Sequence, residues 1–171
     1  DDPPGSLASQ WRPDGLVVLG GPLDVVVVAA SGEETRGVLA PGPGPLTEQW
    51  VTSRLARMQR ECNLLPEFVA RAPGQYPALQ IALQLLVFCI APRADHLFRM
   101  LPPAATASLA AEVDRLLLET LNTLFGLQLD AEQWAQAQRK IASGGLGLRR
   151  RAGARPAAAW LASMGRCYHA V

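Results

Sequence analysis

The chain has 171 residues, a net charge of +1 and a hydrophobic fraction of 49%. This length suits one domain with a buried core, and this composition excludes a chain that is disordered throughout. The longest apolar run, residues 78–91, contains Gln80 and Gln84 and is shorter than the roughly 20 residues that cross a bilayer, so we expect a buried core helix and no membrane partner.

The N-terminal part of the chain is rich in turn residues. Two β-branched runs within residues 15–30 stand on either side of Gly-Gly-Pro, a pattern that predicts a short β-hairpin. Residues 31–46 mix charges with alternating proline and glycine, which predicts a linker. We therefore expect an N-terminal part over 1–46, made of tail, hairpin and linker, and a helical domain over 47–171.

Helical patterns begin at Thr47, which we expect to cap a helix in which apolar residues recur at helical spacing. Residues 71–77 interrupt this pattern, and Pro77 suits the first turn of the apolar helix. That helix is expected to end near 91–93, and a short segment over 94–101 follows.

The strongest helical pattern covers roughly residues 104–125 and ends at Gly126. Asp130, followed by Gln133, resembles a capping box for a helix over 131–142, and Pro156 suits the start of the last helix. The predicted fold class is mainly α, a bundle of about five helices with a short N-terminal β-hairpin. One broad face of the 104–125 helix is expected to be buried, namely Leu109, Val113, Leu116, Leu117, Thr120, Leu121 and Leu124.

The cysteines and the N-terminus bear on the compartment. Cys62, Cys89 and Cys167 are widely spaced, which favours neither a disulfide framework nor a metal site. Residues 1–10 are acidic and proline-rich and have no signal-peptide pattern. These features predict an intracellular protein, nuclear or cytoplasmic.

No catalytic motif is found in the sequence. Ser163 lacks the first glycine and the preceding strand of a nucleophile elbow, and Cys167 and His169 have no further partners for a zinc site or a nucleophile–base pair. The glycines of 144–147 follow a predicted helix and lack the Lys-Ser/Thr of a P-loop. We expect no catalysis, no cofactor and no small-molecule substrate.

Charge is distributed unevenly along the chain. All acidic residues lie at or before Glu132, so the C-terminal end is locally basic and favours a polyanionic partner. Alternatively, the arginines are only solvated while Leu146 and Leu148 pack into the core, and the two interpretations are compatible. The predicted nucleic-acid-binding residues are Arg139, Lys140, Arg149, Arg150, Arg151 and Arg155.

Three stretches, 11–23, 76–103 and 144–163, carry the patterns "WRPDGLVVLGGPL", "APRADHLFRMLPP" and "GGLGLRRRAGARPAAAWLAS" in this order. Together they resemble the region that follows the catalytic palm in reverse-transcriptase-like proteins of non-LTR retroelements. The resemblance implies a primer-grip-like hairpin with Leu19 and Gly20 and a thumb-like helical domain over 47–171. The residues that match the family's helical element, for which the resemblance implies a position but no chemistry, are Arg93, His96 and Arg99. Those that match its glycine motif are Gly144, Gly145, Gly147 and Arg149.

The chain also departs from that family. Residues 24–46 have the character of an insertion, and no "[YF]xDD" motif supplies the paired aspartates of two-metal nucleotidyl transfer. We therefore expect a non-catalytic fragment or degenerate copy of such a protein, with RNA, DNA or an RNA–DNA hybrid as its partner. The alternative is a helical protein-interaction or structural domain without a nucleic-acid role.

Overall fold

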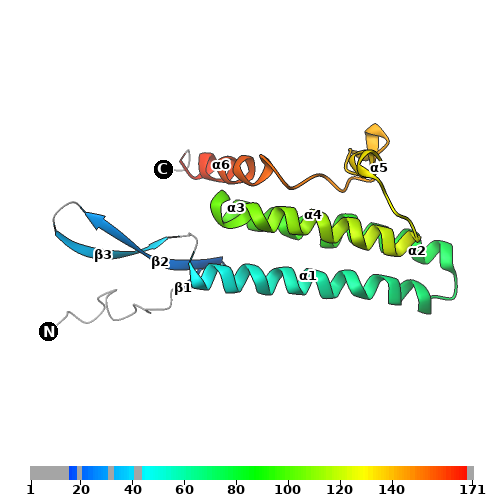
Figure 1. The fold of residues 1–171 in the computed structure, drawn as a ribbon, viewed down its shortest axis with the longest axis horizontal. Coiled ribbons are helices and arrows are strands. Elements are labelled where there is room, and N and C mark those ends of the chain that lie inside the picture. Colours follow the sequence, from blue (N-terminus) through cyan, green and yellow to red (C-terminus); the bar gives the residue numbers. More distant parts are fainter. Residues whose placement is uncertain (1–15, 19–20, 31–32, 41–43, 169–171) are drawn as a thin grey trace.

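The computed structural model describes residues 16–18, 21–30, 33–40 and 44–168, and the described part is mainly helical (Figure 1). Three strands form an antiparallel sheet in the order β1-β2-β3. Their bounds are Leu16–Val18, Gly21–Ala30 and Glu33–Ala40. Leu19 and Gly20, the predicted primer-grip-like residues, lie outside the described residues, so their primer-grip-like role stays a prediction.

Helix α1 spans Pro45–Arg71 and begins earlier than the sequence suggested. Gly44 occupies the N-cap and Pro45 the first turn, where the missing N–H of proline costs nothing. The predicted cap at Thr47 is therefore wrong, because this residue is buried within the first turn. The helix ends at Arg71, and Ala72 after it has the extended backbone conformation that is preferred before a proline.

A long helix follows and does not stop near 91–93, as the sequence had predicted. Pro92 would clash with the carbonyl of Phe88 in a regular helix, and the chain instead widens into a π-helical turn in which Ala91 N–H donates to the Leu86 carbonyl at 2.9 Å. The helix continues beyond the proline. Its parts are α2 (Gln75–Gln84), the π-helix η2 (Leu85–Ile90) and α3 (Pro92–Met100).

This continuity makes the helix longer than its apolar run. Tyr76–Met100 is 25 residues long and, of the described helices, it alone is long and apolar enough to cross a membrane by length and composition. A third of its most apolar window is buried inside the protein, and the helix buries Ala82, Leu86 and Phe98. That inner face packs on other helices, as a core helix does.

The prediction for the next helix is confirmed. Helix α4 spans Pro103–Phe125, all seven residues of its predicted apolar face are buried, and Gly126 ends it with a φ of 62°. Helix α5 starts with the predicted capping box of Asp130 and Gln133 but covers only Ala131–Ala137, not 131–142. The short 3-10 turn η3 (Ile141–Ser143) follows, and α6 (Arg155–Tyr168) closes the described chain.

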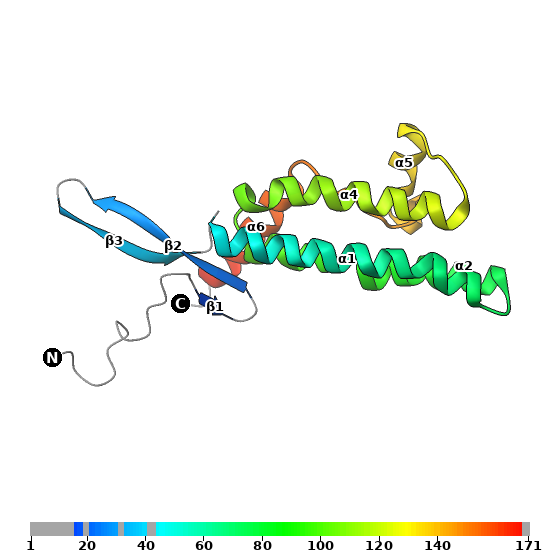
Figure 2. The same ribbon diagram turned by 60° about the horizontal axis from the view of Figure 1, so that its bottom comes forward.

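The described part thus holds five helical segments, with α2, η2 and α3 counted as one. Helices α1 and α4 lie side by side in both ribbon views (Figure 1 and Figure 2), and α6 packs on α3. The core lies between these helices and is closed by Leu148 from the C-terminal segment. Its fully buried large side chains include Leu86, Phe98, Leu116, Leu117, Leu121 and Leu148.

One ion-pair cluster links α1 to α3. Glu61 Oε1 accepts hydrogen bonds from Arg57, whose Nε lies at 3.1 Å, and from Arg93. Burial raises the pKa of Glu61, but the hydrogen bonds from Arg93 and Arg57 outweigh this effect and leave the pKa below its ordinary value. The carboxylate therefore stabilises the fold only while it is ionised.

We expect Glu61→Gln to reduce the acid sensitivity of the protein. A folded-state pKa below the unfolded value of about 4.3 gives stability that is present above that pH and is lost as the pH falls through the folded pKa. Urea unfolding at neutral pH and near pH 3 should show a smaller loss of stability in Glu61→Gln than in the wild type. Glu67→Gln, which removes the exposed ion pair with Arg71, is the matched control. Equal losses of stability at acid pH in all three proteins would contradict the role of Glu61.

Candidate nucleic-acid interface

The glycine segment after α5 folds back on the end of that helix. The amides of Gly145, Leu146 and Gly147 donate to the carbonyls of Lys140, Ala137 and Arg139 at 3.1, 3.0 and 2.9 Å. These three N–H groups are bonded inside the protein, so they do not form a phosphate cradle. The glycines instead permit the close approach of two backbone segments.

The approach is closest at Gly145. A Cβ atom there would lie 2.3 Å from the carbonyl oxygen of Arg139, far inside contact distance. Gly144 and Gly147 have φ values of 73° and 80°, which side chains rarely adopt. Leu148 is then fully buried, as predicted, whereas Leu146 is 37% exposed rather than packed inward.

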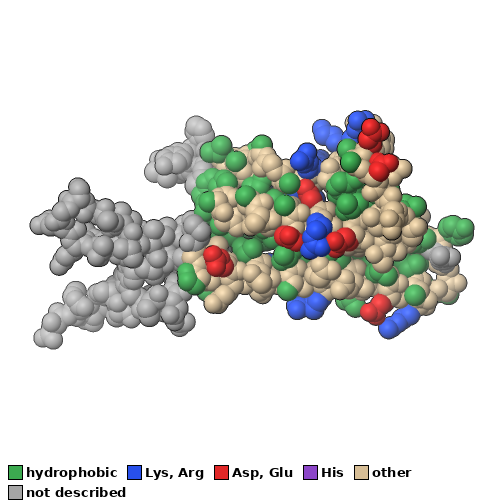
Figure 3. All heavy atoms as spheres, in the orientation of Figure 1, with side chains coloured by type: hydrophobic (Ala, Val, Ile, Leu, Met, Phe, Trp, Pro, Cys, Tyr) green, Lys and Arg blue, Asp and Glu red, His purple; other side chains and the backbone are tan. Residues whose placement is uncertain are grey.

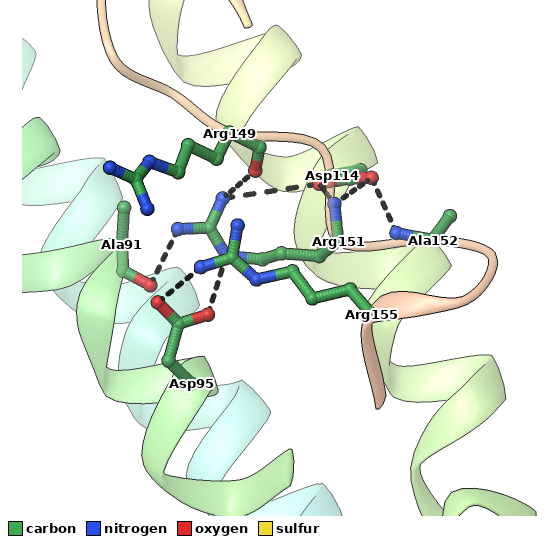
Figure 4. A network of polar contacts seen from close by, with 7 residues as sticks. All are labelled: Ala91, Asp95, Asp114, Arg149, Arg151, Ala152 and Arg155. Atoms are coloured by element: carbon green, nitrogen blue, oxygen red, sulfur yellow. Dashed lines mark hydrogen bonds and ion pairs between the residues drawn. The ribbon is translucent and has the colours of Figure 1, made fainter. Parts of the chain in front are cut away.

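Arg151 is held in a buried polar network that sequence reasoning did not foresee (Figure 4). Its backbone N–H donates to the two carboxylate oxygens of Asp114 at 3.0 and 2.8 Å, and the N–H of Ala152 donates to Asp114 Oδ2 at 2.9 Å. Its guanidinium donates to the carbonyls of Arg149 at 2.7 Å and Ala91 at 2.9 Å. Asp114 on α4 thereby clamps the C-terminal segment to the bundle.

The same network binds Arg155, whose guanidinium donates to Asp95 at 2.6 Å. Burial lowers the pKa of Arg151, and the charges of Asp95 and Asp114 act in the opposite direction. Arg151 is 2% exposed and so lies beyond the reach of an external phosphate. We therefore assign Arg151 a structural role, and Arg155 has its charge balanced by Asp95.

The other predicted binding residues have a different environment. Arg139, Lys140, Arg149 and Arg150 are exposed, and none of the ion pairs between described residues involves them. On the face shown in Figure 3, basic side chains lie along the upper edge, over the segment that joins α5 to α6. These four cations are therefore available to a partner.

Two of them, Lys140 and Arg149, line a hollow of about 380 Å³ together with Phe88. We call it the basic hollow. Phe88 projects from the π-helical turn η2 and is 63% exposed. Sequence reasoning missed this residue because it lies within the apolar run assigned to the core. The remaining wall is formed by Val87, Pro92, Asp95, Ile141, Gly147, Arg151 and Arg155.

Ser163, which was considered as a nucleophile, takes a structural position. The Ser163 hydroxyl donates to the Arg99 carbonyl at 2.8 Å. No group of three or more metal-ligating side chains occurs among the residues whose placement is described.

Comparisons of the chain with protein-family models, curated proteins and solved structures give no match. The function is therefore inferred from the geometry of the chain itself.

Proposed function

We propose that this chain is a helical module that binds the sugar-phosphate backbone of nucleic acid at the basic hollow and the cations beside it. The observation that carries the proposal is the convergence of Lys140 and Arg149 with exposed Phe88 in one hollow. Guanidinium and ammonium groups bind phosphate oxygens, and an exposed aromatic ring offers a stacking surface to a base or sugar. Arg139 and Arg150 are exposed and directly adjacent in the sequence to Lys140 and Arg149, so they add positive charge to the same segments.

The electrostatics of the hollow support an anionic partner. Four cationic side chains line it, Lys140, Arg149, Arg151 and Arg155, against the single carboxylate of Asp95. Arg151 and Arg155 are fixed by internal bonds and paired with Asp95 and Asp114, so the net positive charge of the hollow comes from Lys140 and Arg149, which make the direct contacts. Contacts of this kind position a nucleic acid without reading its sequence.

The sequence resemblance supports the same class of partner. Residues 76–103 and 144–163, which resemble reverse-transcriptase-like proteins of non-LTR retroelements, include Phe88 and Arg149. We propose that the chain is a non-catalytic fragment or degenerate copy of such a protein. An RNA–DNA hybrid is accordingly the first nucleic acid to test.

Replacing Lys140, Arg149 and Arg150 together by glutamine should weaken binding of an RNA–DNA hybrid. Fluorescence anisotropy at several salt concentrations measures the slope of log affinity against log salt, to which each neutralised duplex phosphate contributes about 0.9. We expect the slope of the triple variant to be shallower by roughly two to three.

A matched triple variant, Arg60→Gln, Arg71→Gln and Arg115→Gln, removes equal charge from exposed sites outside the basic hollow. It should keep the wild-type slope within about one unit. Equal slopes for the two triple variants, or a wild-type protein with no salt-dependent binding, would refute the proposal.

A second candidate function is supported by an apolar groove formed by the end of α1 and the start of α2. This groove of about 850 Å³ lies where α1 meets α2, and Leu64, Phe68 and Ile81 in its wall are 57%, 40% and 45% exposed. Exposed apolar surface of this kind is typical of protein-interaction sites. A defined protein partner should be captured even after nuclease treatment, and Phe68→Glu should abolish its capture. This result would favour a protein-interaction function over nucleic-acid binding.

A further inference from the structure

A second cationic groove lies between α1 and α3. Its volume is about 420 Å³, and its floor is made of buried Met58 and Leu97. The side chains that give it chemical character come from both helices: Trp50, Arg54 and Arg57 from α1, and Arg93 and His96 from α3. We call it the α1–α3 groove.

Two of the three guanidinium groups in this groove share one carboxylate, that of Glu61. Glu61 Oε1 accepts from both Arg57 and Arg93, which fixes the two cations next to each other. An arginine has five N–H donors, and each of these two uses one of them in its bond to Glu61. The remaining donors form a preorganised site for the oxygens of a phosphate group.

Arg54 is positioned in a different way. Its guanidinium carbon lies 4.9 Å from the centroid of the Trp50 ring, a cation–π contact, and no ion pair between described residues involves it. This contact holds the guanidinium beside the ring without neutralising its charge. The groove therefore joins an unneutralised cation to an aromatic surface, the combination that single nucleotides of a strand contact.

Helix α3 forms a wall of both cationic sites. Pro92 and Asp95 line the basic hollow, while Arg93 and His96 line the α1–α3 groove. One helix is about 10–12 Å across with its side chains, and phosphates follow each other at about 3.4 Å per strand along the axis of a duplex. About three phosphates therefore span the distance from one site to the other.

We infer that the α1–α3 groove is a second phosphate-binding subsite for the same nucleic acid, reached by a strand that crosses α3 from the basic hollow. This inference rests on the proposed function. It assigns phosphate contacts to Arg54, Arg57 and Arg93, which the charge distribution along the sequence did not single out. The paired guanidiniums and the stacked Trp50 favour a phosphate beside a planar base over the carboxylates of an acidic protein.

The test is the salt dependence of hybrid binding by an Arg54→Gln, Arg57→Gln double variant. An RNA–DNA hybrid of about 20 base pairs is long enough to reach both sites. We expect the slope of log affinity against log salt to become shallower by about one to two. Arg60→Gln with Arg71→Gln removes two charges from the same helix outside the groove and should preserve the slope.

The outcomes separate the two proposals. A shallower slope in both the Lys140/Arg149/Arg150 variant and the Arg54/Arg57 variant supports the second subsite. If only the first variant has a shallower slope, the basic hollow binds alone and the inference is overturned. A wild-type protein that binds no hybrid removes both proposals. Equally tight binding of a poly-glutamate competitor at the α1–α3 groove overturns the inference alone. Arg54→Gln alone, which breaks only the contact with Trp50, serves if the double variant fails to fold.

Discussion

Asp114→Ala should destabilise the protein by about 3–5 kcal/mol, the cost of removing one partner from a buried ionic network. The Asp114 side chain is 11% exposed and accepts backbone hydrogen bonds from Arg151 and Ala152. Without it, these N–H groups lose their partner and the buried guanidinium of Arg151 keeps only Asp95 as a nearby carboxylate, at 3.9 Å. Urea unfolding followed by circular dichroism measures the change.

The control for this variant lies on the same helix. Glu112 pairs with Arg115 at the surface, where both side chains are about half exposed, so Glu112→Ala should change stability by less than about 1 kcal/mol. Asp114→Ala should also loosen the 149–155 segment and weaken hybrid binding. A loss of stability no larger than that of Glu112→Ala would contradict the role of Asp114 as a clamp.

The elements that were predicted well depend on local sequence. The apolar face of α4 recurs at helical spacing, and its end at Gly126 follows from the left-handed backbone that glycine adopts. The capping box of Asp130 and Gln133 needs only residues three positions apart. In each case, the residues that decide the structure lie within one helix or directly beside it.

The environment of Arg151 could not be deduced from its neighbours in the sequence. Three successive arginines suggest a uniformly exposed basic patch, but the partner of the third is a carboxylate 37 positions away. The sequence does contain one indication, since Asp114 interrupts the apolar face between Val113 and Leu117 and a carboxylate there requires a partner. Nothing in the sequence specifies which cation supplies it.

Phe88 illustrates a second limit of sequence reasoning. An apolar run of helical length predicts burial for its aromatic residues, and the π-helical turn before Pro92 changes which side chains face the core. Leu86, Val87 and Ile90 are buried in that turn, and Phe88 is exposed at the edge of the basic hollow. The helical register, and with it part of the candidate site, depends on how the bundle accommodates one proline.

The glycine segment gives the last prediction, because two of its glycines test different physical effects. Gly145→Ala places a Cβ atom 2.3 Å from the Arg139 carbonyl oxygen, so one of two hydrogen-bonded backbone segments has to move. Strain of this kind should cost about 3 kcal/mol in urea unfolding. Gly153→Ala meets no atom within 4 Å and has only its φ of 92° to oppose it, so its cost should be about 1 kcal/mol.

Comparing the loss of stability with the loss of hybrid binding in these variants identifies the role of the glycines. If they served mainly to bring backbone N–H groups to a phosphate, Gly145→Ala would weaken hybrid binding and leave unfolding nearly unchanged. The amides of Gly145, Leu146 and Gly147 are bonded inside the protein, which predicts the opposite result. Gly145→Ala should lose much of its stability, and any loss of hybrid binding should follow from that loss. In that case the glycines shape the support on which Lys140 and Arg149 are held, and the cations alone contact the phosphates.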